Sequence, residues 1–228
     1  MVTDGAVHLV TGARGNLGAA VVAVLRARGA RVATVDRAEG GTDDEGLLAL
    51  GGVDLLDPAA CARAVAATLD RFGRLDGVAH AAGGFAVAKA DEADAAVWER
   101  MFRLNLVTTL NVFRAALPPM RGAGRGALVA VGAAAAGRAG AGFGPYAASK
   151  TAVLRLVESY AAELGRDGIR VNAVLPGTMD TPQNREAMPN ADRSKWVTTA
   201  EVAETIAFLL GPASSGVSGA AVPVTGRG

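Results

Sequence analysis

The most informative segment of the sequence is Thr11-Gly12-Ala13-Arg14-Gly15-Asn16-Leu17-Gly18. It joins a short apolar run, residues 6–11, to residues 16–28, whose apolar positions have the spacing of an amphipathic helix closed by Gly29. Glycines at such a junction allow a tight turn and let backbone N–H groups approach an anion. A glycine-rich turn between a first strand and a first helix therefore predicts a site for the pyrophosphate of a dinucleotide.

Apolar runs and helical patterns alternate along the rest of the chain. Further strands are expected at residues 31–35, 47–53, 76–81, 127–131, 169–175 and 220–224. Helices are expected at residues 58–72, 93–120 with a break before Pro118, 145–164 and 199–210. The strands are continuous apolar runs, which is typical of a parallel sheet buried on both faces. We therefore expect one α/β domain over residues 1–228, a doubly wound parallel sheet of the Rossmann type with helices on both faces and an irregular lid at about 177–198.

Composition limits the partners of the chain. Its 228 residues carry a net charge of +1 without a basic stripe, so neither nucleic acid nor a membrane is an expected partner. No run of about 18 apolar residues is free of glycine and charge, and residues 1–5 lack the basic start of a signal peptide. The single cysteine, Cys61, fits a reducing compartment and is expected to be a small buried residue of helix 58–72. A cytoplasmic protein that acts on a small molecule is the expectation.

Asp36 ends the second expected strand, 18 residues after Gly18. A carboxylate there can accept hydrogen bonds from both hydroxyls of the adenosine ribose and would repel a 2′-phosphate, which favours NAD(H). Arg37 follows directly and could serve a 2′-phosphate, so NADP(H) is not excluded. Asp54, after the third strand, could accept a hydrogen bond from the adenine amino group or act as a capping or loop residue.

Tyr146 and Lys150 stand four residues apart in the helix expected at 145–164, and so lie on one face of it. The charge of the lysine can lower the pKa of the tyrosine toward the range of a general acid. With the glycine pattern, this pair makes the whole chain resemble the short-chain dehydrogenase/reductase family.

The resemblance implies several roles. Asn105 corresponds to the asparagine that helps hold a proton-relay water near the lysine, so the expected catalytic residues are Tyr146, Lys150 and Asn105. The segment 176–181 corresponds to the one that contacts the nicotinamide, with Thr181 as its side-chain partner. No metal site is expected. The expected cofactor contacts are Gly12, Arg14, Gly15, Asn16, Leu17, Gly18, Asp36, Arg37, Asp54, Ala82, Gly83, Tyr146, Lys150, Pro176, Gly177, Met179 and Thr181.

Two positions depart from the family. The usual Asn-Asn-Ala-Gly reads His80-Ala81-Ala82-Gly83 here, with His80 expected to be a packed strand-end residue, or alternatively a ligand or proton carrier. The family's catalytic serine, about thirteen residues before the tyrosine, is Ala133, and residues 126–148 contain no serine or threonine. Ser149 takes the place of a family serine without catalytic role. Loss of such a hydrogen-bond donor to the substrate typically costs about 10²–10³ in rate.

These residues leave three functions open. The first is an NADH-dependent reductase similar to the dihydropteridine reductases, which have alanine at the serine position and reduce quinonoid dihydropteridine, with a small carbonyl or imine as the alternative substrate. The second is a nucleotide-binding relative with little catalytic activity. The third is a carbonyl reductase in which a lid N–H group or His80 replaces the serine.

Two expectations concern the surroundings of the site. Phe85 and Trp196 could stack on a planar ligand or pack the lid onto the body. Family members are commonly dimers or tetramers, so a homodimer or homotetramer formed through residues 93–117 and 145–164 is expected.

Overall fold

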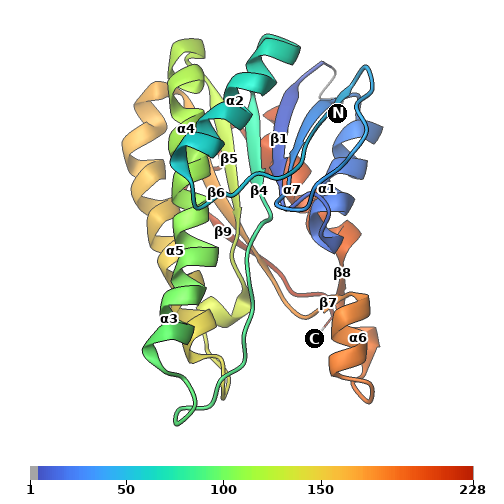
Figure 1. Ribbon diagram of the computed structural model, residues 1–228, viewed down its shortest axis with the longest axis vertical. Helices are drawn as coiled ribbons and strands as arrows, with labels where there is room; N and C mark the ends of the chain where they lie inside the picture. The colour runs from blue at the N-terminus through green and yellow to red at the C-terminus, as the bar shows by residue number, and fades with distance from the viewer. Residues whose placement is uncertain (1–4, 228) are drawn as a thin grey trace.

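The computed structural model describes residues 5–227; residues 1–4, part of the stretch without signal-peptide features, lie outside that range. Seven strands form one parallel sheet in the order β3-β2-β1-β4-β5-β6-β9 (Figure 1), which confirms the doubly wound α/β fold. The strands are β1 Val7–Thr11, β2 Arg31–Val35, β3 Leu47–Leu50, β4 Gly77–His80, β5 Gly126–Val131, β6 Ile169–Pro176 and β9 Ala221–Val224.

Helices cover both faces of the sheet (Figure 1). On one face α2 (Pro58–Phe72), α4 (Thr108–Ala123) and α5 (Gly144–Leu164) pack around a core that includes Leu9, Val78 and Phe113. On the other face α1 (Asn16–Ala27) and α7 (Thr199–Leu210) pack around a core that includes Val10 and Ala79. Neighbouring residues of a strand belong to opposite cores because side chains alternate along a strand.

Local signals in the sequence explain where several helices begin. Asp57 caps α2 by accepting a hydrogen bond from the Ala59 N–H group at 2.8 Å, and Pro58 takes the first helical position, as expected. Thr198 and Glu201 form a reciprocal capping box at the start of α7. Strand β3 ends at Leu50 rather than at residue 53, because Gly52 turns the chain with a φ of +69°.

The expected break before Pro118 is wrong, because α4 continues through Pro118 and Pro119 to Ala123. Proline has no N–H group, so Pro118 cannot donate the usual helical hydrogen bond to the carbonyl of Arg114. Both residues are exposed, and water can bond to that carbonyl instead. Met120 is fully buried one turn further on and keeps the helix against the core. The helix ends at Gly124, which adopts a φ of +63°.

The start of this helical region also differs from the expectation. A first helix, α3 (Ala95–Phe102), runs into α4 through one π-helical turn, η1 (Arg103–Val107). A π turn widens the helix and frees backbone carbonyls from their usual partners. Asn105 lies within this turn.

The lid is more regular than the sequence suggested. It contains β7 (Met179–Asp180), α6 (Pro182–Ala187) and β8 (Val197–Thr198), which pairs in parallel with β7. The side chain of Thr181 starts α6 by accepting a hydrogen bond from the Asn184 N–H group at 3.2 Å. No helix within residues 5–227 is long and apolar enough to cross a bilayer.

His8 is a buried histidine without hydrogen bonds on the α7 side of the sheet. It pairs in register with Gly77, and a Cβ atom at Gly77 would lie 2.7 Å from Nδ1 of His8, so the glycine makes room for the imidazole. The residue is 1 % exposed, and neither ring nitrogen has a hydrogen-bond partner among residues 5–227. Burial lowers the pKa of His8 to about 4.

We therefore expect His8→Leu to raise the free energy of unfolding at pH 7 by about 1–2 kcal/mol, because it removes an unsatisfied buried polar group. The pKa of His8 in the folded state lies below the ordinary value of 6.5, so the unfolded chain takes up a proton at this residue before the folded chain does. The free energy of unfolding is therefore unaffected by His8 titration above pH 6.5. It falls by up to about 1.4 kcal/mol per pH unit as the pH decreases from 6.5 toward 4. Urea unfolding between pH 4.5 and 8 should show that the free energy of unfolding falls less steeply with decreasing pH in His8→Leu than in the parent. Equal slopes would contradict the assignment.

Candidate functional site

The turn between β1 and α1 brings three backbone segments into contact. Gly12 has a φ of +63°, and a Cβ atom on it would lie 2.7 Å from the amide nitrogen of Ala82. A Cβ atom on Gly18 would overlap the carbonyl oxygen of Gly12. No side chain among the described residues caps α1 at Gly15. The first N–H groups of this helix are therefore free to bind an anion, as the pyrophosphate of a dinucleotide requires.

Asp36 lies at the carboxyl end of β2, beside this turn. Its Oδ2 atom accepts a hydrogen bond from the backbone N–H group of Arg14 at 2.9 Å, and its Oδ1 atom accepts one from Ala38 at 3.0 Å. Each oxygen can accept a further bond, so the carboxylate is oriented to take two ribose hydroxyls. The Arg14 guanidinium donates to the Glu39 carbonyl, and Arg37 is exposed.

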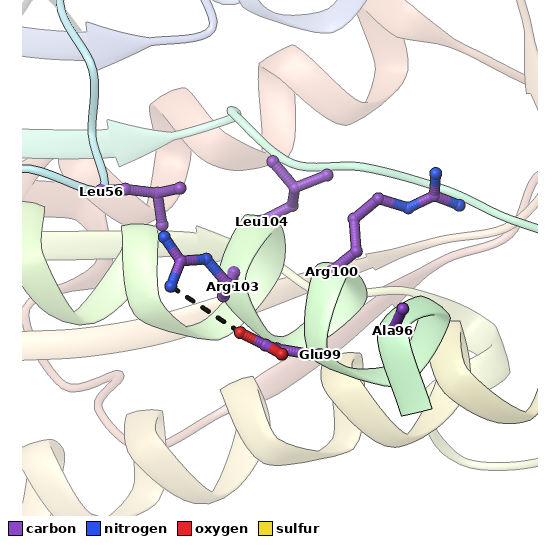
Figure 2. A pocket seen from close by; sticks show the side chains of 6 residues that line it. All are labelled: Leu56, Ala96, Glu99, Arg100, Arg103 and Leu104. Carbon is purple, nitrogen blue, oxygen red and sulfur yellow. Dashed lines mark ion pairs between the residues drawn. The ribbon is translucent and has the colours of Figure 1, made fainter. Parts of the chain in front are cut away.

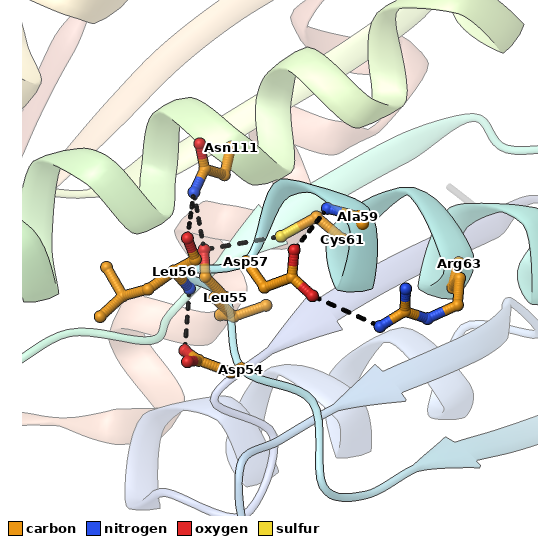
Figure 3. A network of polar contacts seen from close by, with 8 residues as sticks. All are labelled: Asp54, Leu55, Leu56, Asp57, Ala59, Cys61, Arg63 and Asn111. Carbon is orange, nitrogen blue, oxygen red and sulfur yellow. Dashed lines mark hydrogen bonds and ion pairs between the residues drawn. The ribbon is translucent and has the colours of Figure 1, made fainter.

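Asp54 lies in the loop after β3, which a set of polar contacts holds to α4 (Figure 3). Its Oδ1 atom accepts a hydrogen bond from the Leu56 N–H group at 2.9 Å. The buried Asn111, which the sequence analysis did not select, donates to the carbonyl oxygens of Leu55 and Leu56 at 3.0 and 3.3 Å. The Oδ1 atom of Asp54 thus stabilises the loop, and its Oδ2 atom is the one that could accept a hydrogen bond from an adenine amino group.

Cys61 contacts the same loop and is a structural residue. It is 2 % exposed, and its thiol donates to the Leu55 carbonyl at 3.6 Å (Figure 3). Burial raises the pKa of Cys61 to about 11, so the reactive thiolate is disfavoured. The expectation of a small buried residue in α2 is confirmed.

The structure brings Tyr146, Lys150 and Asn105 together beyond the carboxyl ends of β4 and β5. Lys150 is 5 % exposed, and its Nζ atom donates to the Val131 carbonyl at 2.7 Å, which ties α5 to the end of β5. The Asn105 side chain donates from Nδ2 to the Ser149 hydroxyl at 2.9 Å, and that hydroxyl donates to the Tyr146 carbonyl at 2.7 Å. The π turn and α5 are therefore joined directly at the candidate catalytic residues.

Gly83 and Gly84 pass close to this group. The Oδ1 atom of Asn105 accepts a hydrogen bond from the Gly84 N–H group at 2.9 Å. A Cβ atom on Gly83 would lie 2.8 Å from that oxygen and 3.3 Å from the Nζ atom of Lys150. The glycines thus let the segment after β4 run between the glycine-rich turn and the lysine.

Burial controls protonation at the site. It raises the pKa of Tyr146 to about 12 and lowers the pKa of Lys150 to about 8. The sequence suggested instead that Lys150 would lower the pKa of Tyr146, but the cost of burying a charged phenolate dominates. The Tyr146 hydroxyl therefore stays protonated at neutral pH, which suits a group that gives up a proton during a reduction.

Ala133 lies 6 % exposed just after β5, at the start of the short helical turn Ala134–Ala136. The nearest hydroxyl-bearing residues of α5 are committed elsewhere. Ser149 bonds Asn105 and Tyr146, and Thr151 donates to the carbonyls of Ala136 and Ala147, both at 2.9 Å. Neither hydroxyl takes the place of the serine that Ala133 replaces.

Phe85 and Trp196, which the sequence analysis treated together, have different environments. Phe85 is 58 % exposed, and its ring meets Tyr146 edge to face with centroids 4.9 Å apart and Phe143 at 5.4 Å. Trp196 is 8 % exposed, so its ring is buried and has little surface left for a ligand. Only Phe85 presents an aromatic face beside the candidate catalytic tyrosine.

The lid reaches across to the glycine-rich turn. Asn16, at the start of α1, donates from Nδ2 to the Gln183 side chain at 2.7 Å. The Gly177 N–H group donates to the Val224 carbonyl at 3.1 Å, and the Met179 carbonyl accepts from the Asn184 side chain at 2.8 Å. The segment that follows Pro176 is therefore held over the end of the sheet, whereas Thr181 uses its hydroxyl to cap α6.

One cavity of about 260 Å³ lies apart from these residues (Figure 2). It opens between Leu56 and the α3–η1 helical region, where Arg103 pairs with Glu99 at 3.9 Å. None of the candidate catalytic residues lines it. Within residues 5–227 no group of three or more His, Cys, Asp or Glu side chains could hold a metal ion.

Comparisons with known proteins agree with this geometry. Residues 12–226 match the family model described as enoyl-(acyl carrier protein) reductase, and the chain belongs to this family of short-chain dehydrogenases/reductases. It is 38 % identical to cis-4-hydroxycyclohexanecarboxylate dehydrogenase of Sinomonas cyclohexanicum, over 96 % of this chain and 95 % of the relative.

Solved structures show the same fold. A short-chain dehydrogenase/reductase of Mycobacterium ulcerans is 30 % identical and superposes with a TM-score of 0.92, covering 100 % of this chain and 90 % of the other. The 3-ketoacyl-(acyl-carrier-protein) reductase of Brucella melitensis, solved in complex with NADH, is 27 % identical with a TM-score of 0.88, covering 98 % of each chain.

The position of Asp36 predicts how the chain discriminates between cofactors. Asp36→Asn removes the charge that would repel a 2′-phosphate, so the ratio of the NADPH to the NADH dissociation constant should fall about tenfold, a difference of about 1.4 kcal/mol. Fluorescence titration with both cofactors measures it. Asp70→Asn, the same change of charge on the exposed surface of α2, is the control and should leave the ratio unchanged. An unchanged ratio in Asp36→Asn would remove this residue from the adenosine site.

Proposed function

We propose that the chain is an NAD(H)-dependent oxidoreductase that reduces a small molecule by hydride transfer, with Tyr146 as proton donor. The observation that carries this proposal is the clustering of Tyr146, Asn105 and Lys150 beside the glycine-rich turn. Asn105 is bonded through Ser149 to the backbone of Tyr146, and both Asn105 and Lys150 border Gly83, which follows the residue that lies against Gly12. When bound, the nicotinamide supplies the hydride. The NADH complex of the Brucella relative supports NAD(H) here, as do the acidic side chain of Asp36 and its two backbone donors.

Each candidate catalytic residue has a distinct task. The Tyr146 hydroxyl, kept protonated by burial, gives its proton to the substrate atom that accepts the electron pair. Lys150 then stabilises the phenolate that this transfer leaves behind, because its ammonium group lies one helical turn away. Asn105 holds the Ser149 hydroxyl and the segment at Gly84, and so fixes the spacing between the tyrosine helix and the cofactor side of the site.

The substrate that fits this site best is a planar conjugated compound, with quinonoid dihydropteridine as our specific candidate. Ala133 offers no hydroxyl to polarise an ordinary carbonyl, whereas a conjugated quinonoid ring accepts hydride readily. The exposed ring of Phe85, which packs on Tyr146, provides a surface for a flat ligand. The dihydropteridine reductases, which the sequence resembles at Ala133, have the same alanine.

A cyclic carbonyl compound is the second candidate. The observation in its favour is the relative that is 38 % identical and is named for a hydroxycyclohexanecarboxylate. A nucleotide-binding protein with little catalysis is the third, and the intact Tyr146, Lys150 and Asn105 group argues against it, since binding alone does not require a buried proton donor. The homodimer or homotetramer expected from the sequence stays a prediction.

Tyr146→Phe tests the proton donor. With quinonoid dihydropteridine generated in the cuvette, the parent chain should oxidise NADH, and the variant should lose at least about 10²-fold in kcat, because it has no proton to donate. Its dissociation constant for NADH should stay within about threefold of the parent value, roughly 0.7 kcal/mol. Tyr160→Phe, the other tyrosine of α5, should behave like the parent. If the parent chain binds NADH but turns over neither the pteridine nor cyclic ketones, the proposal fails and the nucleotide-binding protein with little catalysis becomes the favoured function.

Ala133→Ser tells the two substrate classes apart. If the site lacks only a donor for an ordinary carbonyl, kcat/KM for 4-oxocyclohexanecarboxylate should rise by about 10²-fold. Turnover of quinonoid dihydropteridine should change little, because that substrate does not depend on the donor. Ala134→Ser adds the same hydroxyl one residue later and is the matched control. A ketone activity already high in the parent and unchanged by Ala133→Ser would show that another group fulfils this role.

A further inference from the structure

A continuous set of hydrogen bonds runs through His80 from the glycine-rich turn to the π turn. Thr11 and His80 are register partners at the carboxyl ends of β1 and β4, and the Thr11 hydroxyl lies 2.9 Å from Nδ1 of His80. On the other side of the ring, Nε2 lies 3.2 Å from the hydroxyl of Thr108. Thr11, His80 and Thr108 are 0, 2 and 5 % exposed, so water contributes little to these contacts.

The direction of the bonds in this set follows from the Thr108 end and from the charge of the imidazole. The Ala82 N–H group donates to the Thr11 hydroxyl at 3.3 Å, and that hydroxyl still has its hydrogen to donate to Nδ1 of His80. At the other end the Thr108 hydroxyl donates to the Leu104 carbonyl at 2.8 Å, so it accepts from His80 through Nε2–H. Burial lowers the pKa of His80 to about 3, so the imidazole is neutral, with Nε2–H as its donor and Nδ1 as the acceptor of the Thr11 hydroxyl hydrogen.

Both ends of the set belong to functional segments. Thr11 directly precedes Gly12, and Ala82 directly precedes Gly83, which borders Asn105 and Lys150. Leu104 lies in the π turn next to Asn105, whose own carbonyl accepts a hydrogen bond from the Thr109 hydroxyl at 2.6 Å. The hydroxyls of Thr108 and Thr109 thus each donate a hydrogen bond to a carbonyl of the π turn. Of these two hydroxyls, the one of Thr108 is also bonded to His80 and through it to the glycine-rich turn.

We propose that His80 is a positioning residue that links the phosphate-binding turn to the π turn carrying Asn105, so that NADH binding and proton transfer depend on one another. From Asn105 the contact continues through Ser149 to the backbone of Tyr146. A change at either end alters the same hydrogen bonds. His80 itself touches neither cofactor nor substrate, since both of its nitrogens are bonded to threonines.

His8 shows that burial alone does not create this link. It is as buried as His80 and lies on the neighbouring strand, but it faces the α7 side of the sheet and makes no hydrogen bond within residues 5–227. The two histidines therefore form a matched pair, in which one connects two segments of the candidate site and the other fills space.

The first measurement is the dissociation constant for NADH, which needs no substrate. His80→Leu should raise it about tenfold, because two buried hydrogen bonds beside the turn are lost. Thr108→Val should raise it about threefold, roughly 0.7 kcal/mol, although Thr108 lies in the helical region and not in the turn. The double variant should bind no more weakly than His80→Leu, since both changes break the same set. His8→Leu should bind NADH within twofold of the parent.

The second measurement is turnover and rests on the proposed function. The kcat of His80→Leu should fall about tenfold, while KM for the second substrate should change less than twofold, because that substrate does not contact the set. Thermal unfolding of each variant reports folding. If His80→Leu does not fold, His80→Asn and Thr108→Val are measured in its place. Because His80→Asn keeps a donor and an acceptor, its dissociation constant for NADH should lie between that of the parent and the roughly tenfold higher value expected for His80→Leu.

The outcomes separate the two proposals. NADH binding by the parent without turnover would defeat the proposed function but leave the binding measurements as a test of His80. Folded His80→Leu and Thr108→Val variants with NADH affinities within twofold of the parent would overturn the link. Independent, additive losses in the double variant would overturn it as well, because they would show that the two residues act separately.

Discussion

The contact between the backbones of Gly12, Gly18 and Ala82 is the constraint on which the rest of the site depends. A side chain on Gly18 would overlap the Gly12 carbonyl, and one on Gly12 would press on Ala82 at 2.7 Å. Because these atoms touch, β1, α1 and the segment after β4 are held at one edge of the sheet. Lys150 and Asn105 can reach this edge only because Gly83 leaves them room.

Polar groups are buried on both faces of the sheet, and among the described residues only the ring nitrogens of His8 are buried polar side-chain atoms without a hydrogen-bond partner. Thr11, His80 and Thr108 form a complete set on the α4 side, and Asn111 fixes the loop after β3 with its amide. His8 on the opposite face lacks a partner and costs stability. The polar groups on the α4 side thus hold segments of the candidate site in register, and the apolar cores supply most of the stability.

The sequence predicted the features that depend on local rules. Continuous apolar runs indicate a parallel sheet, and the caps at Asp57 and Gly29 follow from backbone chemistry that does not depend on distant contacts. The π turn, the passage of α4 through Pro118 and the role of Asn111 could not be predicted in this way. Each depends on what packs against the helix from elsewhere in the chain, as with the burial of Met120. The raised pKa of Tyr146 could not be predicted from the sequence either. The spacing shows that Lys150 is near in the helix, but it does not show how far the fold removes the tyrosine from water.

Two features of the candidate site act in the same direction. Burial keeps the Tyr146 hydroxyl protonated, and the alanine at 133 withdraws the donor that would otherwise polarise a carbonyl before hydride arrives. A carbonyl that is not polarised is a poor hydride acceptor, so the function proposed above assigns to this site substrates whose own conjugation lowers the barrier. The proton is then needed only after the electron pair has reached the substrate. An acid with a high pKa suits that order of events, because it donates readily to the strong base that hydride transfer creates and not to the neutral ground state.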